Sequence, residues 1–467
     1  MKSLSYHTGF WLLSIAVVFI FCIPALVQHG MFLDGITYAA ISKNLANGIG
    51  TLWQPQYTAT FNQEFYGHPP VFFIIQSLFF KLLGNHFMVE RLFSFGMLLL
   101  SGYALVLLWR TVTKPINLHQ YAWLPLILWI TIPQVAWTYT NNMLETMVSA
   151  CSLFSIYFLY RSTHSKALLN IGLGTLCMWI AYGVKGPVGL FPLSFFIFHY
   201  LVFKRYSLRV TLGKTGLILV VFSLLFALLF VIQPQSLQAF SKYHNIQVIS
   251  ALQGTNEITA SWYGALLPQL LGALAPLLIL CFVVFIWQRR NYKAKGLSHS
   301  GSQVIVFFVL LGLAGSLPLM ITLKQRLFYA VPSFSLFAFA AALYVVVYIT
   351  NIPVLISKIA GYLALCIISV SLLCAIQSYN SYAKDEQLLN DIQALMKYVP
   401  PHTIVKCDTE LAHNWKVIAY LQRYASISIS DTVIESRYEL SSNASKHLQA
   451  IHTKHIAFDS FVFFQKK

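Results

Sequence analysis

Long apolar runs are the feature that most constrains what this 467-residue chain can fold into. Many of them reach the roughly 18 to 20 residues that a helix needs to cross a bilayer. Hydrophobic residues make up 57% of the chain and charged residues only 10%, whereas soluble domains carry about 25% charged residues. The sequence therefore predicts an all-α protein that crosses a membrane many times.

Basic residues divide the connections between these runs into two groups. The net charge of +17 comes from Lys and Arg that gather in alternate connections, and cytoplasmic connections collect such charges. The first loop is therefore expected outside. No basic stripe with stacking aromatic residues is found, which argues against nucleic acid; contact with anionic membrane lipids remains open. We expect about 11 to 13 transmembrane helices, placed near 10–28, 91–109, 120–139, 143–160, 167–184, 187–203, 215–232, 263–287, 303–321, 327–347 and 359–377.

Composition divides the chain into two domains. Residues 1–379 form the predicted transmembrane domain, whose first outer loop, 29–89, has helical apolar spacing at 35–47 and 70–84. We expect these stretches to be interfacial helices. Residues 380–467 are polar and predict a small α/β domain outside the membrane. Its helix-like segments are 386–398, 411–423 and 443–452, and its strand-like segments are 403–407, 426–430 and 455–464.

Two candidate residues lie in the first outer loop. Asp34 follows the first span directly, where burial could raise the pKa of a carboxyl towards that of a general base. It could equally be the N-cap of a helix that begins near Gly35. His68 precedes the rigid pair Pro69-Pro70. It could bind a phosphate or transfer a proton, or be an ordinary interfacial histidine.

Four further candidates lie at the outer ends of later spans. Glu145 opens a helix, where its charge also suits the helix dipole. Lys185, in Lys185-Gly186-Pro187, could be a snorkelling side chain at a hairpin. Lys324 and Arg326 lie outside, against the charge rule. We therefore favour a role in binding a phosphate leaving group over simple anchoring.

In this order these pieces resemble bacterial GT-C glycosyltransferases, of the protein O-mannosyltransferase-like family that includes the lipid A aminoarabinose transferases. The resemblance covers about residues 10–345 and rests on Asp34, His68-Pro69-Pro70, Glu145, Lys185-Gly186-Pro187 and the set Arg326, Tyr329 and Pro332.

The resemblance implies a GT-C fold in an inner membrane, with an active site that faces the periplasm. It implies a polyprenyl-phosphate sugar as donor and a lipid (such as lipid A), a cell-envelope glycan or a protein as acceptor. Asp34 and Glu145 would be catalytic, and His68, Lys324, Arg326 and Tyr329 would bind the donor phosphate, with inversion at the anomeric carbon.

One position departs from the aminoarabinose transferases. Their Glu-Lys before the paired prolines is Gly67-His68 here, so only Glu64 or His68 could substitute, and binding of a divalent metal ion stays open. Glu64, Tyr66, Arg91 and Lys185 are further site candidates. In the middle outer loop His244 and Glu257 are the obvious polar residues.

Three other classes of protein were weighed. A transporter or lipid flippase would place paired charges inside its spans, around a midplane site, whereas here the charges gather at outer ends. A polysaccharide polymerase or ligase would use a large loop between late spans, whereas the richest loop here is the first. A structural scaffold would leave Asp34, His68 and Arg326 unexplained.

Overall fold

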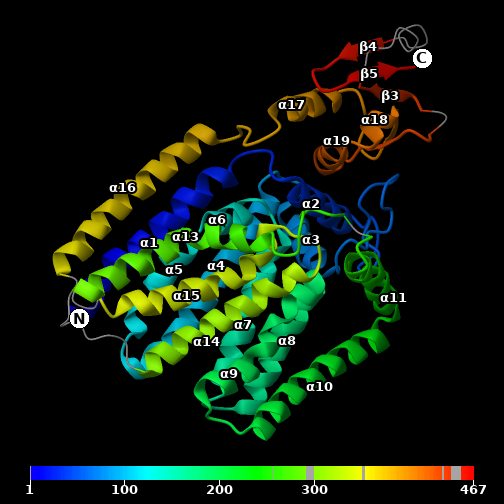
Figure 1. The fold of residues 1–467 in the computed structure, drawn as a ribbon. Coiled ribbons are helices and arrows are strands. Elements are labelled where there is room, and N and C mark those ends of the chain that lie inside the picture. Colours follow the sequence, from blue (N-terminus) through cyan, green and yellow to red (C-terminus); the bar gives the residue numbers. More distant parts are fainter. Residues whose placement is uncertain are drawn as a thin grey trace.

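The computed structural model describes residues 2–255, 257–290, 299–349, 353–433, 436–442 and 454–466. A tall bundle of helices carries a small sheet domain at one end, and the chain begins near the opposite end of the bundle (Figure 1). The bundle contains α1 (Lys2–Leu26), α4 (Val89–Thr113), α5 (Trp123–Ile130), α6 (Pro133–Thr140), α7 (Leu144–Arg161), α8 (Ala167–Lys185), α9 (Phe195–Phe203), α10 (Leu208–Ile232), α13 (Leu266–Arg290), α14 (His299–Ser316), α15 (Val331–Val346) and α16 (Val354–Ser378).

Eight helical segments of the described chain are long and apolar enough to cross a membrane, or nine if α6 and α7, which meet at 115°, count as one broken span. The polytopic all-α prediction is therefore confirmed. α16 packs along α1, and α10 lies at the edge of the bundle, where most of its side chains are exposed (Figure 1). Exposed apolar faces of this length suit lipid rather than water.

One predicted span is divided between two short helices, α5 and α6. α5 begins beside α1, where Trp123 stacks on Phe10 with ring centroids 4.3 Å apart. α6 ends at the other end of the bundle, where the Thr140 carbonyl accepts a hydrogen bond from Arg91 at 3.2 Å. The predicted span 120–139 thus consists of two short helices, α5 and α6, with the break at Pro133, whose ring cannot continue a helix.

The run 167–203 crosses and returns. After α8 a 3-10 helix, η3 (Gly186–Ser194), leads into α9. A Cβ on Gly189 would lie 2.6 Å from the Ala181 carbonyl carbon, so the returning chain packs directly on α8. The Tyr206 hydroxyl lies 3.4 Å from the Thr163 carbonyl oxygen, which brings the two ends of this hairpin together. The separate spans predicted at 167–184 and 187–203 correspond to its two legs.

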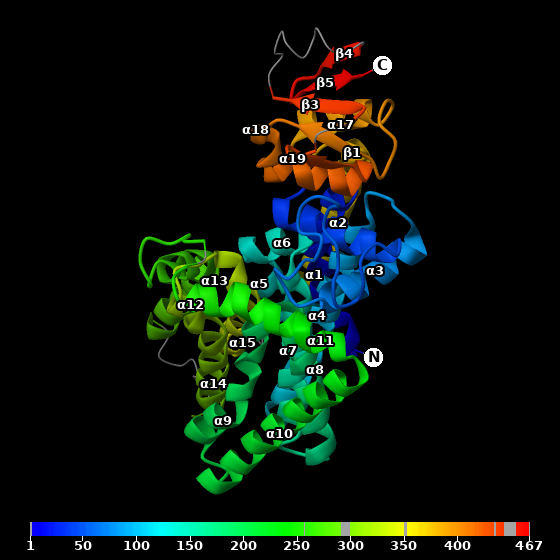
Figure 2. The same cartoon turned by 90° about the vertical axis from the view of Figure 1, so that its right-hand side faces the viewer.

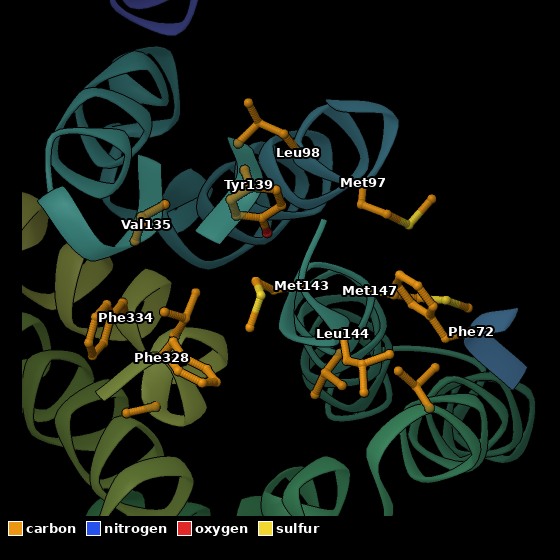
Figure 3. Packing of buried hydrophobic residues seen from close by; sticks show 14 of the residues in the cluster. Phe72, Met97, Leu98, Val135, Tyr139, Met143, Leu144, Met147, Phe328 and Phe334 are labelled. Atoms are coloured by element: carbon orange, nitrogen blue, oxygen red, sulfur yellow. The ribbon is translucent and has the colours of Figure 1, made fainter. Parts of the chain in front are cut away.

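The bundle interior is apolar where α6, α7 and α15 meet. Figure 3 shows Tyr139, Met143, Leu144 and Phe328 packed close together at this junction. All four side chains are at least nine-tenths buried. This packing fixes the start of α7, where Glu145 follows.

Both helices predicted in the first loop are present, as α2 (Leu33–Ala46) and α3 (Val71–Leu83). With 13 residues α3 is about 20 Å long, which is too short to span a bilayer. α2 is buried from Gly35 to Leu45, apart from Thr37, because the C-terminal domain covers it (Figure 2).

The C-terminal domain combines a five-stranded sheet with helices, as predicted. The strand order is β2-β1-β3-β5-β4; β1 pairs in parallel with β2 and β3, and β5 pairs antiparallel with β3 and β4. Its elements are α17 (Glu386–Leu395), β1 (Ile404–Cys407), α18 (Thr409–Ala412), α19 (Trp415–Tyr420), the π-helix η7 (Leu421–Ala425), β2 (Ser428–Ser430), β3 (Tyr438–Ser441), β4 (Lys454–Ala457) and β5 (Val462–Gln465).

Two strand predictions need correction. The segment 455–464 was expected as one strand, but it is a hairpin of β4 and β5. Its turn is held by a 2.7 Å hydrogen bond from the Ser460 N–H to Asp391. β3 was not predicted, because a four-residue strand gives too little alternation to detect. The helix expected at 443–452 lies outside the described residues.

A buried ion pair joins the C-terminal domain to the bundle. Arg423 donates from Nε and Nη2 to the two oxygens of Glu90 at 3.0 and 2.7 Å, and both side chains are almost fully buried. Arg423 also bonds Asn85 and the His86 carbonyl. The Lys43 ammonium of α2 donates to the carbonyls of Gln422 and Arg423 at 2.8 and 2.7 Å. These charge-assisted bonds anchor the domain onto α2 and α4.

Glu90→Ala should strongly destabilise the protein, because it leaves the Arg423 guanidinium buried and unpaired, at a cost of about 3–5 kcal/mol. A clear fall in the thermal unfolding temperature of the detergent-purified protein is expected. The exposed pair Lys242–Glu64 provides the control: Lys242→Ala should change stability by less than about 1 kcal/mol. Equal unfolding temperatures for the two variants would contradict a structural role for the buried pair.

Candidate functional site

Asp34 lies in the first turn of α2, at its second residue. The helix starts at Leu33, with Phe32 at the N-cap position and no side-chain cap. The alternative reading of Asp34 as an N-cap is therefore wrong. Its carboxylate makes no hydrogen bond or ion pair with any of the described residues. Burial raises the pKa of Asp34 above its usual value, while the positive charges of Lys185, Arg326 and Lys324 oppose that rise.

Two asparagines tie the start of α2 to the start of α7. The Asn141 Oδ1 accepts from the Phe32 N–H at 2.8 Å, and the Asn142 Nδ2 donates to the Gly35 carbonyl at 2.9 Å. A Cβ on Gly35 would lie 2.0 Å from the Asn141 carbonyl oxygen, so only glycine permits this approach. The two acidic motifs of the sequence, Asp34 and Glu145, are thereby held side by side.

Glu145 and Lys185 form a buried ion pair between α7 and α8. Both side chains are buried, at 0% and 7% exposure. The Lys185 Nζ also lies 4.1 Å from the centre of the Tyr329 ring, a cation–π contact. The second oxygen of Glu145, Oε2, is buried with no hydrogen-bond partner among the described residues. An ammonium group buried without a partner would be costly, so the pair with Glu145 offsets this cost and holds Lys185 in place.

The two outer cations lie in the connection between η5 (Leu317–Ile321) and η6 (Leu327–Ala330). Arg326 pairs with Glu257 at 3.1 Å, and both side chains are about half exposed. Lys324 donates to Gln247 at 3.3 Å. Burial lowers the pKa of Lys324, and the nearby carboxylates Glu257 and Asp34 oppose this. These cations face Asp34 within electrostatic range.

His68 completes the site from the first loop. Its Nε2 lies 3.0 Å from the hydroxyl of Tyr38, which stands one helical turn after Asp34. Burial, together with the charges of Lys185 and Lys324, holds the pKa of His68 well below its usual value. The ring is therefore neutral near pH 7, and it can donate or accept a hydrogen bond but supplies no fixed positive charge.

The structure gathers seven of the ten predicted site residues around one centre. Electrostatic interactions connect Asp34, His68, Glu145, Lys185, Lys324, Arg326 and Tyr329.

The other three lie elsewhere. Glu64 and the buried Tyr66 form a cluster with Lys242, in which Glu64 lies 2.9 Å from the Lys242 Nζ and 3.0 Å from the Tyr66 hydroxyl, and the two charged side chains are exposed. Arg91 is buried and donates to the carbonyls of Gly30 and Thr140, which makes it a support for the chain before α2.

Sequence reasoning did not assign roles to Tyr38, Asn141 and Asn142. The one available signal was their position inside the motifs of Asp34 and Glu145. Asn142 also has a positive φ of 54°, a conformation that asparagine adopts more readily than most residues.

No group of three or more His, Cys, Asp or Glu residues that could hold a metal ion occurs in the part of the chain that the structure describes. The two substitutes considered for a metal ligand are engaged otherwise, Glu64 with Lys242 and His68 with Tyr38. Binding of a divalent metal ion stays a prediction that rests on the resemblance.

The fold and the site define a class. The structure of ArnT from Cupriavidus metallidurans in the apo state superposes with a TM-score of 0.65 over 98% of both chains, at 13% identity. The same protein bound to undecaprenyl phosphate gives 0.65 at 12% identity, over 99% of this chain and 98% of that one. The archaeal oligosaccharyltransferase AglB from Archaeoglobus fulgidus, in complex with an inhibitory peptide and a dolichol-phosphate, gives 0.51 at 11% identity, over 94% of this chain and 70% of that one. The chain has the GT-C glycosyltransferase fold.

A family match agrees with the fold. Residues 67–232 match the model of the dolichyl-phosphate-mannose-protein mannosyltransferase family. This segment contains His68, Glu145 and Lys185. A comparison with curated protein sequences finds no match. The resemblance inferred from the sequence is confirmed, because residues 67–232 are similar to this family and the whole chain has the GT-C fold.

Gly35→Ala should disturb the site, because the new Cβ would push α2 away from Asn141. We expect a lower thermal unfolding temperature for the purified protein. Gly96→Ala is the matched control: it also adds a methyl group within a helix, but no atom lies within 4 Å of the new Cβ, and alanine favours a helix by about 1 kcal/mol over glycine. Equal thermal unfolding temperatures for Gly35→Ala and Gly96→Ala would refute the close approach of α2 to Asn141.

Proposed function

We propose that this protein transfers a sugar from a polyprenyl-phosphate donor to an acceptor at the periplasmic face of the inner membrane, with Asp34 as the catalytic carboxylate. The observation that carries the proposal is a largely buried carboxylate, Asp34, that bonds to none of the described residues and lies within electrostatic range of three cations, Lys185, Lys324 and Arg326. The likeness to ArnT bound to undecaprenyl phosphate and to AglB bound to a dolichol-phosphate supports a lipid-phosphate donor.

In the proposed reaction Asp34 takes the proton of the acceptor group as it attacks the anomeric carbon. The bond between that carbon and the phosphate oxygen breaks on the opposite face, so the configuration inverts. The oxygen leaves with the electron pair as polyprenyl phosphate. Lys324 and Arg326 meet the negative charge that grows on this phosphate, and fixed cations stabilise such a transition state. The raised pKa of Asp34 suits a base that works near neutral pH.

The remaining residues are proposed to position the reacting groups. Glu145 is engaged by Lys185 and so acts through it. Lys185 adds fixed positive charge beside Tyr329. His68, neutral and bonded to Tyr38, can contact the phosphate as a hydrogen-bond donor.

The orientation is supported by charge. The site, the first loop and the C-terminal domain lie at one end of the bundle (Figure 2), while the clusters at Arg161–Lys166 and Lys204–Lys214 lie at the other end, joined by the contact between Tyr206 and Thr163. Positive clusters belong on the cytoplasmic side. The charged site at the ends of helices also favours transfer at the outer face over transport through a midplane site.

Replacing Asp34 tests the proposal. Purified protein is incubated with radiolabelled polyprenyl-phosphate sugars and a membrane extract as acceptor, and transfer is measured. Asp34→Asn removes the base at nearly constant shape and should lower kcat about 10²- to 10⁴-fold. The control is Glu64→Gln, because Glu64 is exposed and lies in the Lys242 cluster; it should retain wild-type kcat. Full activity of Asp34→Asn would exclude Asp34 as the catalytic base.

Arg326 should set the pH dependence. Transfer requires ionised Asp34, so kcat falls as the pH drops through the pKa of Asp34. The charge of Arg326 lowers that pKa; Arg326→Gln should therefore raise it and move the acidic limb of the kcat profile to higher pH. The donor KM should also rise. Lys242→Gln removes a cation outside the site and should leave the acidic limb at its wild-type pH. An acidic limb at the wild-type pH in Arg326→Gln would show that Arg326 does not influence the pKa of Asp34.

A further inference from the structure

The three residues that precede the helix of Asp34 have their peptide groups held by side chains from separate elements. The Gly30 carbonyl accepts from Arg91 of α4, and the Phe32 N–H donates to Asn141. Between them, the Met31 N–H donates to the Tyr420 hydroxyl at 3.3 Å, and that hydroxyl lies 3.2 Å from the Met31 carbonyl oxygen. Tyr420 thus contacts both polar groups of a residue three positions before Asp34.

Tyr420 belongs to α19 of the C-terminal domain, 389 residues away in the sequence. Its side chain is fully buried, and its hydroxyl lies 3.0 Å from Asp385, at the start of α17. Tyr424 of η7 accepts from the Gly30 N–H at 3.5 Å. The domain therefore reaches the chain before Asp34 through two consecutive turns of one helical segment.

Main-chain pairing reinforces this contact. The His29 N–H donates to the Ser381 carbonyl and the Ala383 N–H donates to the His29 carbonyl, both at 2.8 Å. Gly30 has a φ of +73°, and a Cβ there would lie 2.2 Å from the Lys384 carbonyl oxygen. The connection into the C-terminal domain thus lies directly against the turn before α2, which leaves that turn little freedom.

The anchors of the domain match this role. The buried pair Arg423–Glu90 and the bonds of Lys43 lie in the same segment, within three and six residues of Tyr420. Burying a charge pair is expensive unless its geometry is well satisfied, so these contacts fix one docked position. A domain that was only a tethered appendage would need no such fixed register over α2.

We propose that the C-terminal domain is a positioning part of the catalytic site, in which Tyr420 holds the 30–32 segment and thereby sets the place of Asp34. The expected effect of Tyr420 on sugar transfer rests on the proposed function. Its expected effect on the position of the 30–32 segment rests on the hydrogen bonds alone. Tyr420 is not proposed to contact the substrate, because its hydroxyl is already hydrogen-bonded to Met31 and Asp385.

The test compares Tyr420→Phe with Tyr438→Phe in the full-length purified protein. Both variants remove one hydroxyl from an aromatic side chain of the same domain. Tyr438 stacks on Phe463 within the sheet, away from Met31. For Tyr420→Phe we expect a kcat lowered about 10-fold or more, a donor KM within about twofold of wild type, and an acidic limb of the kcat profile displaced from its wild-type pH, because a misplacement near 1 Å is that costly. Tyr438→Phe should match wild type in all three.

Amide hydrogen exchange separates this inference from the proposed function. Exchange at residues 30–33, followed by mass spectrometry, should be faster in Tyr420→Phe than in wild type and unchanged in Tyr438→Phe. This result would support the contact even if wild type transferred no sugar from any donor. Wild-type exchange together with a wild-type kcat and pH profile in Tyr420→Phe would overturn the inference. Loss of protection throughout the C-terminal domain would also overturn it, because Tyr420 would then serve folding in general.

Discussion

A carboxylate that is mostly removed from water, yet bonds to no residue in the described part of the chain, is the constraint on which the site depends. Burying such a charge is costly unless other charges offset it. Here the offset comes from Lys185, Lys324 and Arg326 acting at a distance, which leaves the oxygens of Asp34 open to a substrate. Two of these cations are themselves paired, Lys185 with Glu145 and Arg326 with Glu257. The site therefore holds three anions, Asp34, Glu145 and Glu257, and three cations. A phosphate that binds to these cations competes most directly with the exposed Glu257.

The difference in burial between the two pairs divides their roles. Glu145 and Lys185 are enclosed by the apolar packing of α7 and α8, so they act as one fixed dipole of the scaffold. Glu257 and Arg326 are about half exposed, and surface pairs of this kind contribute little energy. Arg326 can thus exchange its partner for a phosphate at small cost, whereas Lys185 cannot. Lys185 and Glu145 therefore supply the permanent electric field of the site, and Arg326 supplies the contact that a phosphate can take over.

Local patterns predicted the parts of this structure that depend on local chemistry. The apolar runs gave the crossings, and charged residues at the outer ends of spans gave Asp34, Glu145, Lys185, Lys324 and Arg326. Contacts that join distant segments could not be predicted in this way. Arg91 and Glu64 were site candidates through the resemblance, and in the structure one supports the Gly30 carbonyl and the other pairs with Lys242. The bond between Tyr420 and Met31 leaves no periodic signal, because each residue is ordinary in its own segment.

The contact between Tyr420 and Met31 also gives the chain a sequence of assembly. Tyr420 is synthesised 389 residues after Met31, the residue whose main chain it contacts. Every membrane helix described here except α1 is synthesised in between. A nascent chain therefore carries Asp34 well before Tyr420 is made, and the 30–32 segment gains this contact only when the C-terminal domain has folded and docked. A product truncated before Tyr420 would keep Asp34 but lack the side chain that holds the segment before it.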